Sequence, residues 1–384
     1  MFELSKSDVL QRESSKMVLQ QLINGGITTR AQISRDLGLN KSTVSSIYDD
    51  LKDYGIVTEV GEGEASKVGG RRPTRIKLNA EFGYTISLDL AYHRIHFMVN
   101  YLDASVISRE DINIEGDSIE QIVSKITDRI DYYGRTTSSV NGLLGIGISI
   151  HGIVKDGQIT YSPFLDMGDK DIKKEFEYKY NVPVYLENES NLTGLYVRDF
   201  LNNEEIKNLI AISIHKGIGS GIILNNGLFR GFNGEAGEVG RTLTKTNDGH
   251  YATIESICSE DAIINYVVER SSVEKLSRQD LIRLLDKKDK LAFEAMDRFI
   301  SEISMLIFNV AMNFDTKSIY IGSPLMQEKP EIFGLISEAV RNFGKSDIEL
   351  ILLDDSDKAC LLGACSLVTH EVLGISAADL NFGS

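Results

Sequence analysis

The sequence is poor in the residues and patterns that mark secreted and membrane proteins. Its 384 residues include no tryptophan and three cysteines, Cys258, Cys360 and Cys365, which are too few for a disulfide framework and favour a reducing compartment. No apolar run reaches the roughly 18 residues that span a bilayer, and the polar N-terminus has no signal-peptide core. We therefore expect a cytoplasmic protein without a membrane segment, long enough for two or three domains.

Positive charge is also scarce, but it is unevenly distributed. The net charge is −15, which argues against a surface that binds nucleic acid throughout. Residues 1–80, however, hold 12 basic and 10 acidic side chains, whereas the remainder holds 29 and 46. This contrast predicts a mildly basic head, residues 1–80, on an acidic body, residues 81–384.

The head has the pattern of a helix-turn-helix. Apolar periodicity predicts a helix over residues 16–24, a second helix capped by Thr28 or Thr29, and a third over residues 41–54 that follows a turn at Gly38. The start of the third helix is small, polar and basic on its outward face, as a helix that enters the major groove requires. The predicted DNA-contacting residues of the head are Thr29, Arg30, Lys41, Ser42, Thr43, Ser45, Ser46, Arg71 and Arg72.

Two of these residues, Arg71 and Arg72, lie in a predicted wing. Residues 56–60 and 74–78 can pair as strands, and the tip between them contains Gly69-Gly70-Arg71-Arg72-Pro73. Its glycines allow the backbone to lie near phosphate or in a minor groove. The alternative, a winged helix used only for protein contacts, is made less favourable by this basic tip.

The body repeats one plan. Strands are expected at residues 84–90, 94–100, 106–114 and 143–150, with an amphipathic helix at 118–133 before the last, and a second series begins with strands at 209–214 and 221–224. Such a repeat predicts two α/β lobes that face each other across a cleft.

The glycine-rich stretch over residues 209–241 resembles the sugar-pocket segment of the ROK family of repressors and sugar kinases. Its loop reads Ala236-Gly237-Glu238-Val239-Gly240-Arg241, with arginine where the family has histidine. The resemblance covers nearly the whole chain, and the Gly-Gly-Arg-Arg-Pro tip resembles the wing of ROK repressors. It implies an α/β fold: a winged helix-turn-helix followed by a two-lobed body that is actin-like and sugar-kinase-like, and thus ribonuclease H-like.

The resemblance also implies a sugar site. Asn188-Glu189 resembles the family's asparagine–aspartate pair, with a glutamate in place of the kinase base; the alternative is a solvated surface turn. The implied sugar-binding residues are Asn188, Glu189, Glu238, Arg241 and Glu255. Arg241 either contacts the effector or pairs with Glu238 or Glu255 as a structural strut.

The features that the family uses for ATP are degraded. The phosphate-binding Asp-x-Gly-Gly-Thr corresponds to Asp89-Leu90-Ala91-Tyr92-His93, without a glycine cradle or hydroxyl. His215-Lys216 and Ile321-Gly322-Ser323-Pro324 depart from the second phosphate turn and the adenosine contact. We expect no kinase activity.

The family's zinc ligands are also replaced. By this resemblance they correspond to Arg241, Thr246, Asp248 and Thr253, which cannot form a soft tetrahedral site. We expect no metal and no cofactor.

The sequence therefore predicts a repressor that binds double-stranded operator DNA and is controlled by a sugar or sugar phosphate in the cleft. A homodimer, possibly a tetramer, would match a two-fold symmetric operator. The alternatives are a sugar kinase with an added head and a regulator controlled mainly by a protein partner.

Overall fold

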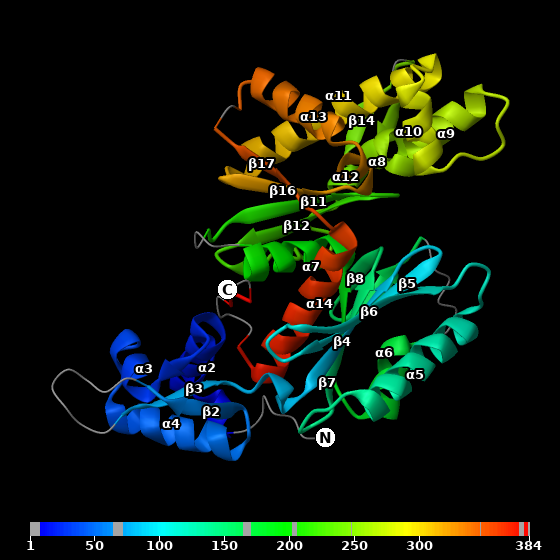
Figure 1. Ribbon diagram of the computed structural model, residues 1–384. Coiled ribbons are helices and arrows are strands. Elements are labelled where there is room, and N and C mark those ends of the chain that lie inside the picture. The colour runs from blue at the N-terminus through cyan, green and yellow to red at the C-terminus, as the bar shows by residue number, and fades with distance from the viewer. Residues whose placement is uncertain are drawn as a thin grey trace. The chain divides into compact units, whose positions relative to one another are not determined.

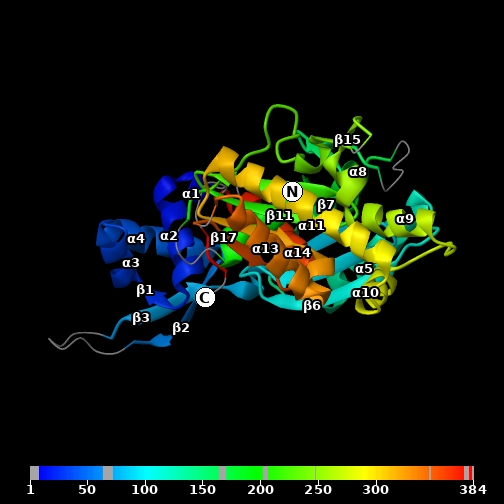
Figure 2. The same cartoon turned by 90° about the horizontal axis from the view of Figure 1, so that it is seen from above.

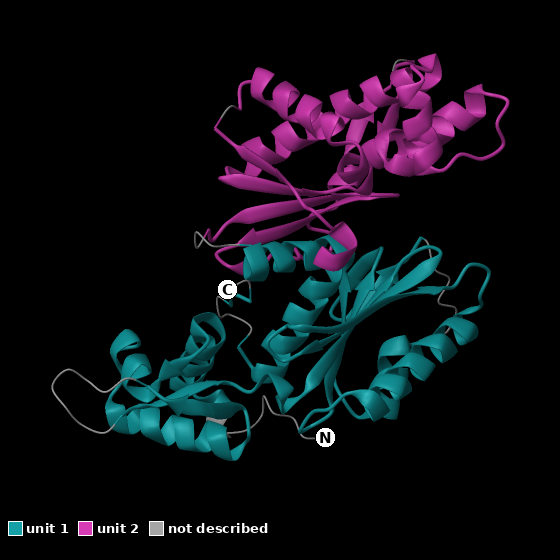
Figure 3. Cartoon of the chain, viewed as in Figure 1, with its two compact units in different colours: residues 1–205, 360–384 teal, residues 206–359 magenta. Residues whose placement is uncertain are grey.

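A computed structural model describes residues 8–63, 72–163, 170–201, 206–246, 248–345, 347–375 and 380–382. The chain divides into two compact units (Figure 3). Unit 1 contains residues 1–205 and 360–384, and unit 2 contains residues 206–359. No helix among the described residues is long and apolar enough to cross a membrane. The prediction that a domain boundary lies near residue 80 stays a prediction.

The head is a winged helix-turn-helix (Figures 1 and 2). Its elements are α1 (Asp8–Gln11), α2 (Glu13–Gly25), β1 (Thr28–Thr29), α3 (Arg30–Asp36), α4 (Lys41–Asp53), β2 (Val57–Glu62) and β3 (Thr74–Leu78). The strands form a sheet in the order β1-β3-β2. The two predicted wing strands are confirmed, and β1 is an addition that two residues of sequence could not indicate.

The head and the end of the chain share one buried apolar cluster. Leu19 of α2 and Leu51 of α4 are fully buried in it. Its members from the end of the chain are Val368, Val372, Leu373, Ile375 and Leu380. Since apolar burial stabilises by about 25 cal/mol per Å², the head is held within unit 1 by packing as well as by its covalent connection.

The rest of unit 1 is built on a five-stranded sheet with the order β10-β7-β4-β5-β6. The strands are β4 (Tyr84–Leu90), β5 (Arg94–Tyr101), β6 (Val106–Asn113), β7 (Leu143–Ile150) and β10 (Val184–Asn188). The strands β4, β5 and β6 are antiparallel neighbours, whereas β7 is parallel to both β4 and β10. The carboxyl ends of three parallel strands therefore meet at one edge, where ligands of α/β proteins bind.

Helices cover both faces of this sheet (Figure 1). The helices α5 (Ile119–Thr136) and α6 (Ile172–Tyr180) pack on one face and α14 (Ser356–Leu373) on the other. Glycines on β7 permit the approach of α14, because a Cβ at Gly147 would lie 2.9 Å from the carbonyl oxygen of Ala364. A Cβ at Gly145 would likewise lie 2.8 Å from Val368 Cγ1.

Unit 2 repeats the same strand plan. Its sheet has the order β13-β12-β11-β16-β17, made of β11 (Leu209–Ile214), β12 (Ile218–Leu224), β13 (Gly227–Leu228), β16 (Ser318–Gly322) and β17 (Glu349–Leu352). Asn225 and Asn226 have φ values of 51° and 64°, as the tight hairpin turn that joins β12 to β13 requires. The core lies between this sheet and a set of helices, among them α8 (Ile254–Cys258), α9 (Glu260–Arg270), α11 (Lys290–Phe314) and α13 (Pro330–Asn342). The predicted pair of similar α/β lobes is confirmed.

Candidate functional site

The first turns of α4 present the predicted DNA-contacting side chains. Lys41, Ser42 and Ser46 are exposed, while Thr43 and Ser45 are half-buried. The opposite face of α4 is anchored in the core of the head by buried apolar residues. The helix thus offers a short, polar and basic face of the kind that reads base edges in the major groove. Asn40 lies at the N-cap of α4, but its side chain makes no capping hydrogen bond.

Thr29 and Arg30 sit where α3 begins. The Thr29 hydroxyl oxygen accepts a hydrogen bond from the Gln32 N–H at 3.2 Å, which caps the helix. The Arg30 guanidinium lies 4.8 Å from the centre of the Tyr48 ring, a cation–π contact between α3 and α4. Both side chains therefore have a structural role in the head in addition to the DNA contact that we predict.

The wing is described only at its base. The Gly63 N–H donates to the Pro73 carbonyl oxygen at 2.7 Å, and Arg72 lies 3.9 Å from Glu62 in an exposed ion pair. Arg71 lies outside the described residues. Its predicted phosphate contact therefore stays a prediction.

In unit 1, Asn188 and Glu189 stand at the carboxyl end of β10, where α7 (Glu189–Tyr196) begins. Asn188 caps α7, because its Oδ1 accepts from the Ser190 and Asn191 N–H groups at 2.9 and 3.2 Å. Its Nδ2 donates to the Gly152 carbonyl at 2.7 Å. Glu189 is only 7% exposed, so the alternative of a solvated surface turn is wrong.

Two buried neighbours of this pair were missed from the sequence. Glu187 accepts hydrogen bonds at Oε1 from the Asn188 N–H and from Asn191 Nδ2, both at 2.9 Å. Asn191 is 3% exposed, and its Oδ1 has no hydrogen-bond partner among the described residues. A buried amide oxygen without a partner requires a donor such as a hydroxyl or a water molecule. The alternation of apolar and polar residues along β10 and α7 is too weak a signal to have predicted either residue.

His151 is a third residue that sequence reasoning missed. It follows β7 directly, and its Nε2 lies 2.9 Å from Oδ1 of Asp89, near the end of the neighbouring strand β4. Burial acts to raise the pKa of Asp89, but the nearby His151 and His96 outweigh burial and lower this pKa to about 2. In place of a glycine cradle, this edge of the sheet therefore carries a carboxylate–imidazole pair.

In unit 2, the glycine-rich loop lies against β12. A Cβ at Gly237, where φ is 92°, would lie 1.9 Å from the Ser220 carbonyl oxygen, so no side chain fits there. Glu238 is half-buried beside this contact. Its pKa is raised, chiefly by burial; Arg241 acts against this rise, while Glu255 adds to it. Glu255 lies near Gly217, with its Oε2 3.5 Å from the position that a Cβ would take there.

Arg241 does not form the buried strut considered from the sequence. Its Nη1 lies 3.7 Å from Glu235 Oε1, with side chains that are 46% and 50% exposed. Arg241 is thus an exposed cation near Glu238. Unit 2 brings Glu238, Arg241 and Glu255 together, while Asn188 and Glu189 belong to unit 1.

The segment that would hold zinc forms a hairpin instead. Strands β14 (Leu243–Lys245) and β15 (Tyr251–Thr253) pair, and the Thr246 hydroxyl bridges their turn by donating to Asp248 and lying 2.9 Å from the His250 carbonyl oxygen. The described residues contain no group of three or more His, Cys, Asp or Glu side chains able to hold a metal ion. Cys258 is buried, and burial raises its pKa to about 12.

Known proteins match this chain over almost its whole length. The ROK family model matches residues 85–371. A xylose repressor of Lactiplantibacillus pentosus is 43% identical over 374 residues, which are 97% of this chain and 96% of that protein. A xylose repressor of Staphylococcus xylosus is 38% identical, with 98% and 99% covered.

Solved structures show the same fold. A ROK transcriptional regulator, described as a homologue of the Escherichia coli MLC protein, has a TM-score of 0.77 at 20% identity and covers 96% of this chain and 98% of its own. A ROK glucokinase from Streptomyces griseus, in complex with glucose and AMPPNP, has a TM-score of 0.63 at 20% identity and covers 74% of this chain and 99% of its own. The solved structures confirm the predicted fold, and the two repressors that match nearly the whole chain confirm the predicted function as a DNA-binding transcriptional regulator. This chain belongs to the ROK family.

Proposed function

We propose that this protein is a xylose-responsive repressor, in which α4 and the wing bind operator DNA and D-xylose binds to the ROK body. The observation that carries the proposal is the joint presence of a winged helix-turn-helix and a body whose ATP-phosphate turn lacks glycines and whose Asp89 is paired with His151. Xylose is chosen because two relatives that match nearly the full chain are xylose repressors.

The chemistry of the site favours a neutral sugar over a sugar phosphate. Within unit 1, the carboxylates of Glu187 and Glu189 can accept hydrogen bonds from hydroxyl groups, and Asn191 Oδ1 requires a donor. Within unit 2, Glu238 and Glu255 offer the same kind of acceptor. A phosphate dianion next to either pair of acids would be repelled, and in unit 2 Arg241 would offset only part of that repulsion. A pentose offers several hydroxyl donors and carries no charge. We propose that Asn188 acts mainly by setting the start of α7, because its amide is already engaged.

We propose further that the protein has no kinase activity. A sugar kinase must hold the nucleotide phosphates with backbone N–H groups, hydroxyls or cations. The turn after β4 instead carries the side chains of Tyr92 and His93, and Asp89 is paired with His151. The glutamate at the position of the kinase base accepts from Ser190 at 3.1 Å and Thr193 at 3.3 Å.

A homodimer or a tetramer in the cytoplasm completes the proposal. Two heads related by a two-fold axis would bind two half-sites of a palindromic operator, about one helical turn or a multiple of it apart. Sedimentation velocity gives the oligomeric state.

The test begins with a duplex selected by the wild-type protein from a random library. Fluorescence anisotropy measures binding to this duplex with and without D-xylose, D-glucose and xylose 5-phosphate, and calorimetry measures the binding of each sugar. We expect D-xylose to bind and to change the DNA affinity, and a coupled assay with Mg-ATP to show no phosphorylation of xylose. Failure to select any duplex, or turnover of ATP with a sugar, would overturn the proposal.

A further inference from the structure

The helix that begins at the candidate sugar site continues into an unusual turn. After α7, the chain forms one turn of π-helix, η3 (Val197–Leu201), without a break. Glu189 lies at the first position of this helical segment, and Arg198 and Asp199 lie in its last turn, all of them buried. Turns of π-helix inside longer helices frequently mark functional positions.

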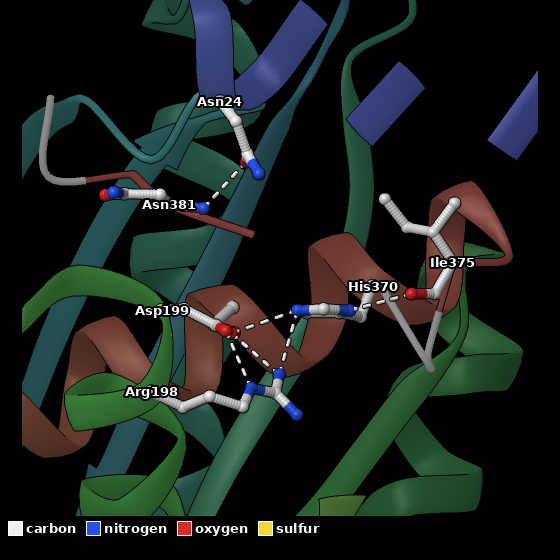
Figure 4. A network of polar contacts seen from close by, with 7 residues as sticks. Asn24, Arg198, Asp199, His370, Ile375 and Asn381 are labelled. Atoms are coloured by element: carbon white, nitrogen blue, oxygen red, sulfur yellow. Dashed lines mark hydrogen bonds and ion pairs between the residues drawn. The ribbon is translucent and has the colours of Figure 1, made fainter. Parts of the chain in front are cut away.

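Asp199 joins this turn to α14 (Figure 4). Its carboxylate accepts two hydrogen bonds of 2.7 Å from Nε and Nη2 of Arg198, and it lies 2.9 Å from His370 Nε2. The Ser366 hydroxyl, also on α14, donates to the same carboxylate. Burial alone acts to raise the pKa of Asp199, but His370 and Arg198 lower it to about 2. Asp199 is therefore an anion whose hydrogen bonds come from two elements.

The same residues hold the end of the chain. His370 Nδ1 donates to the Ile375 carbonyl oxygen at 3.0 Å, because a carbonyl can only accept. The Phe382 N–H donates to the Asp199 carbonyl oxygen at 2.8 Å. The Phe382 ring lies 5.1 Å from Phe200, which stacks on Tyr196 of α7 at 5.3 Å. We call Ile375 and residues 380–382 the C-terminal strap.

The strap also contacts the DNA-binding head. The Asn381 N–H donates to Asn24 Oδ1, in the last turn of α2, at 2.8 Å. Ile375 and Leu380 are buried in the cluster that contains Leu19 and Leu22 of the same helix. Adjacent residues of the strap thus face two elements: Asn381 bonds to α2, and Phe382 bonds to η3.

We propose that the C-terminal strap couples the sugar site to the head: a shift of α7 and η3 on sugar binding displaces Phe382 and, through Asn381, α2. The proposal rests on the proposed function, in which a sugar bound at Glu189 controls DNA binding. Its physical basis is that a displacement of about 1 Å lengthens a 2.8 Å hydrogen bond beyond bonding range. The Asp199 carboxylate contacts His370 of α14, and its carbonyl oxygen accepts from the Phe382 N–H. A shift of η3 must therefore either carry Phe382 with it or break this backbone hydrogen bond.

The test is the double variant Asn24→Ala/Phe382→Ala, which removes the strap's hydrogen bond to the Asn24 side chain of α2 and its aromatic contact with Phe200. A matched control is Asn113→Ala/Phe343→Ala. Asn113 Oδ1 also accepts one backbone N–H, at 2.8 Å from Glu115, and Phe343 also meets one ring, 5.8 Å away in Phe308. Anisotropy with the selected duplex gives the ratio of DNA dissociation constants with and without D-xylose, and calorimetry gives the affinity for D-xylose without DNA.

In the wild type and the control we expect D-xylose to change the DNA dissociation constant by about tenfold or more, within the usual range of allosteric coupling. In the strap variant this ratio should fall to within about threefold of one, while the affinity for D-xylose changes by less than about threefold. A strap variant with the wild-type ratio overturns the coupling proposal. A wild type that does not respond to D-xylose overturns the proposed function instead.

If the strap variant does not bind the duplex, hydrogen exchange measured without DNA tests the coupling between the sugar site and α2. D-xylose should change the exchange of the α2 amides in the wild type and in the control but not in the variant. An equal change in the variant overturns the proposal.

Discussion

Replacing Arg241 by alanine should lower the affinity for D-xylose while leaving the fold intact. Arg241 has an ion pair with Glu235 at 3.7 Å, and both side chains are about half exposed, at 46% and 50%. Exposed pairs of this kind contribute about 0–1 kcal/mol. A buried strut would contribute about 3–5 kcal/mol if broken. We therefore expect Arg241→Ala to lower the free energy of unfolding by less than about 1 kcal/mol, measured by urea denaturation without sugar.

The effect on the sugar should be larger. A hydrogen bond from a charged donor contributes about 1.5–3 kcal/mol, which corresponds to a loss of about 10- to 100-fold in affinity. Arg241 also acts to lower the pKa of Glu238, so its removal should raise that pKa further. Isothermal calorimetry with D-xylose measures the combined effect of the lost hydrogen bond and of the changed pKa of Glu238. The pH dependence of the dissociation constant for D-xylose separates the two effects.

Two controls define the result. Arg241→Lys keeps the charge and should retain part of the affinity, because lysine lacks the planar fork of arginine. Arg270→Ala removes another exposed arginine of unit 2, which pairs with Glu269 at 3.3 Å, and should not change the binding of D-xylose. A loss of stability of about 3 kcal/mol or more in Arg241→Ala would refute the reasoning from exposure. Unchanged affinity for D-xylose would remove Arg241 from the effector site.

Further outcomes follow from the wing, the phosphate turn, the zinc positions and the buried acid. Arg71→Ala/Arg72→Ala should weaken DNA binding and lower its salt slope by roughly one to two phosphate equivalents in anisotropy titrations; an unchanged slope would exclude the wing from the interface. Calorimetry should detect no micromolar binding of Mg-ATP. Elemental analysis should find no stoichiometric zinc in the purified protein. The free energy of unfolding should fall as the pH drops from about 4 towards 2, because Asp199 has a pKa of about 2 when folded and about 3.9 when unfolded. In Asp199→Asn, about 1 kcal/mol of the loss between pH 7 and pH 3 should be absent in urea titrations at pH 7, 4 and 3; an equal acid loss would show that Asp199 is not the group responsible.

Local patterns predicted much of the fold. The Thr29 cap and the apolar periodicity of α4 both depend on residues close in sequence, so their structural consequence could be predicted directly. The repeated series of strands predicted two similar lobes, and the two sheets indeed have the same order of strands. The hairpin of β14 and β15 was not predicted, because each strand has only three residues and so gives no clear alternating pattern.

The candidate site could be predicted only in part. The sequence identified Glu189 and Glu238 as acids in a sugar-binding context, but it did not indicate that the first is almost fully buried or that the second has a raised pKa. His151 was missed because a lone histidine after an apolar strand has no distinctive spacing. Its role depends on the register that places it beside Asp89, on a strand 62 residues earlier.

The family, the two kinds of module and the loss of the phosphate cradle could be predicted from the sequence, because each depends on residue types within short segments. Which charges are buried, and what they contact, depends on the tertiary structure. Asp199 and His370 are 171 residues apart, and Asn24 and Asn381 are 357 apart, so no local pattern relates the members of either pair. Only folding brings these groups within hydrogen-bonding distance, because their positions are set by the packing of α14 and the end of the chain against the sheet and the head.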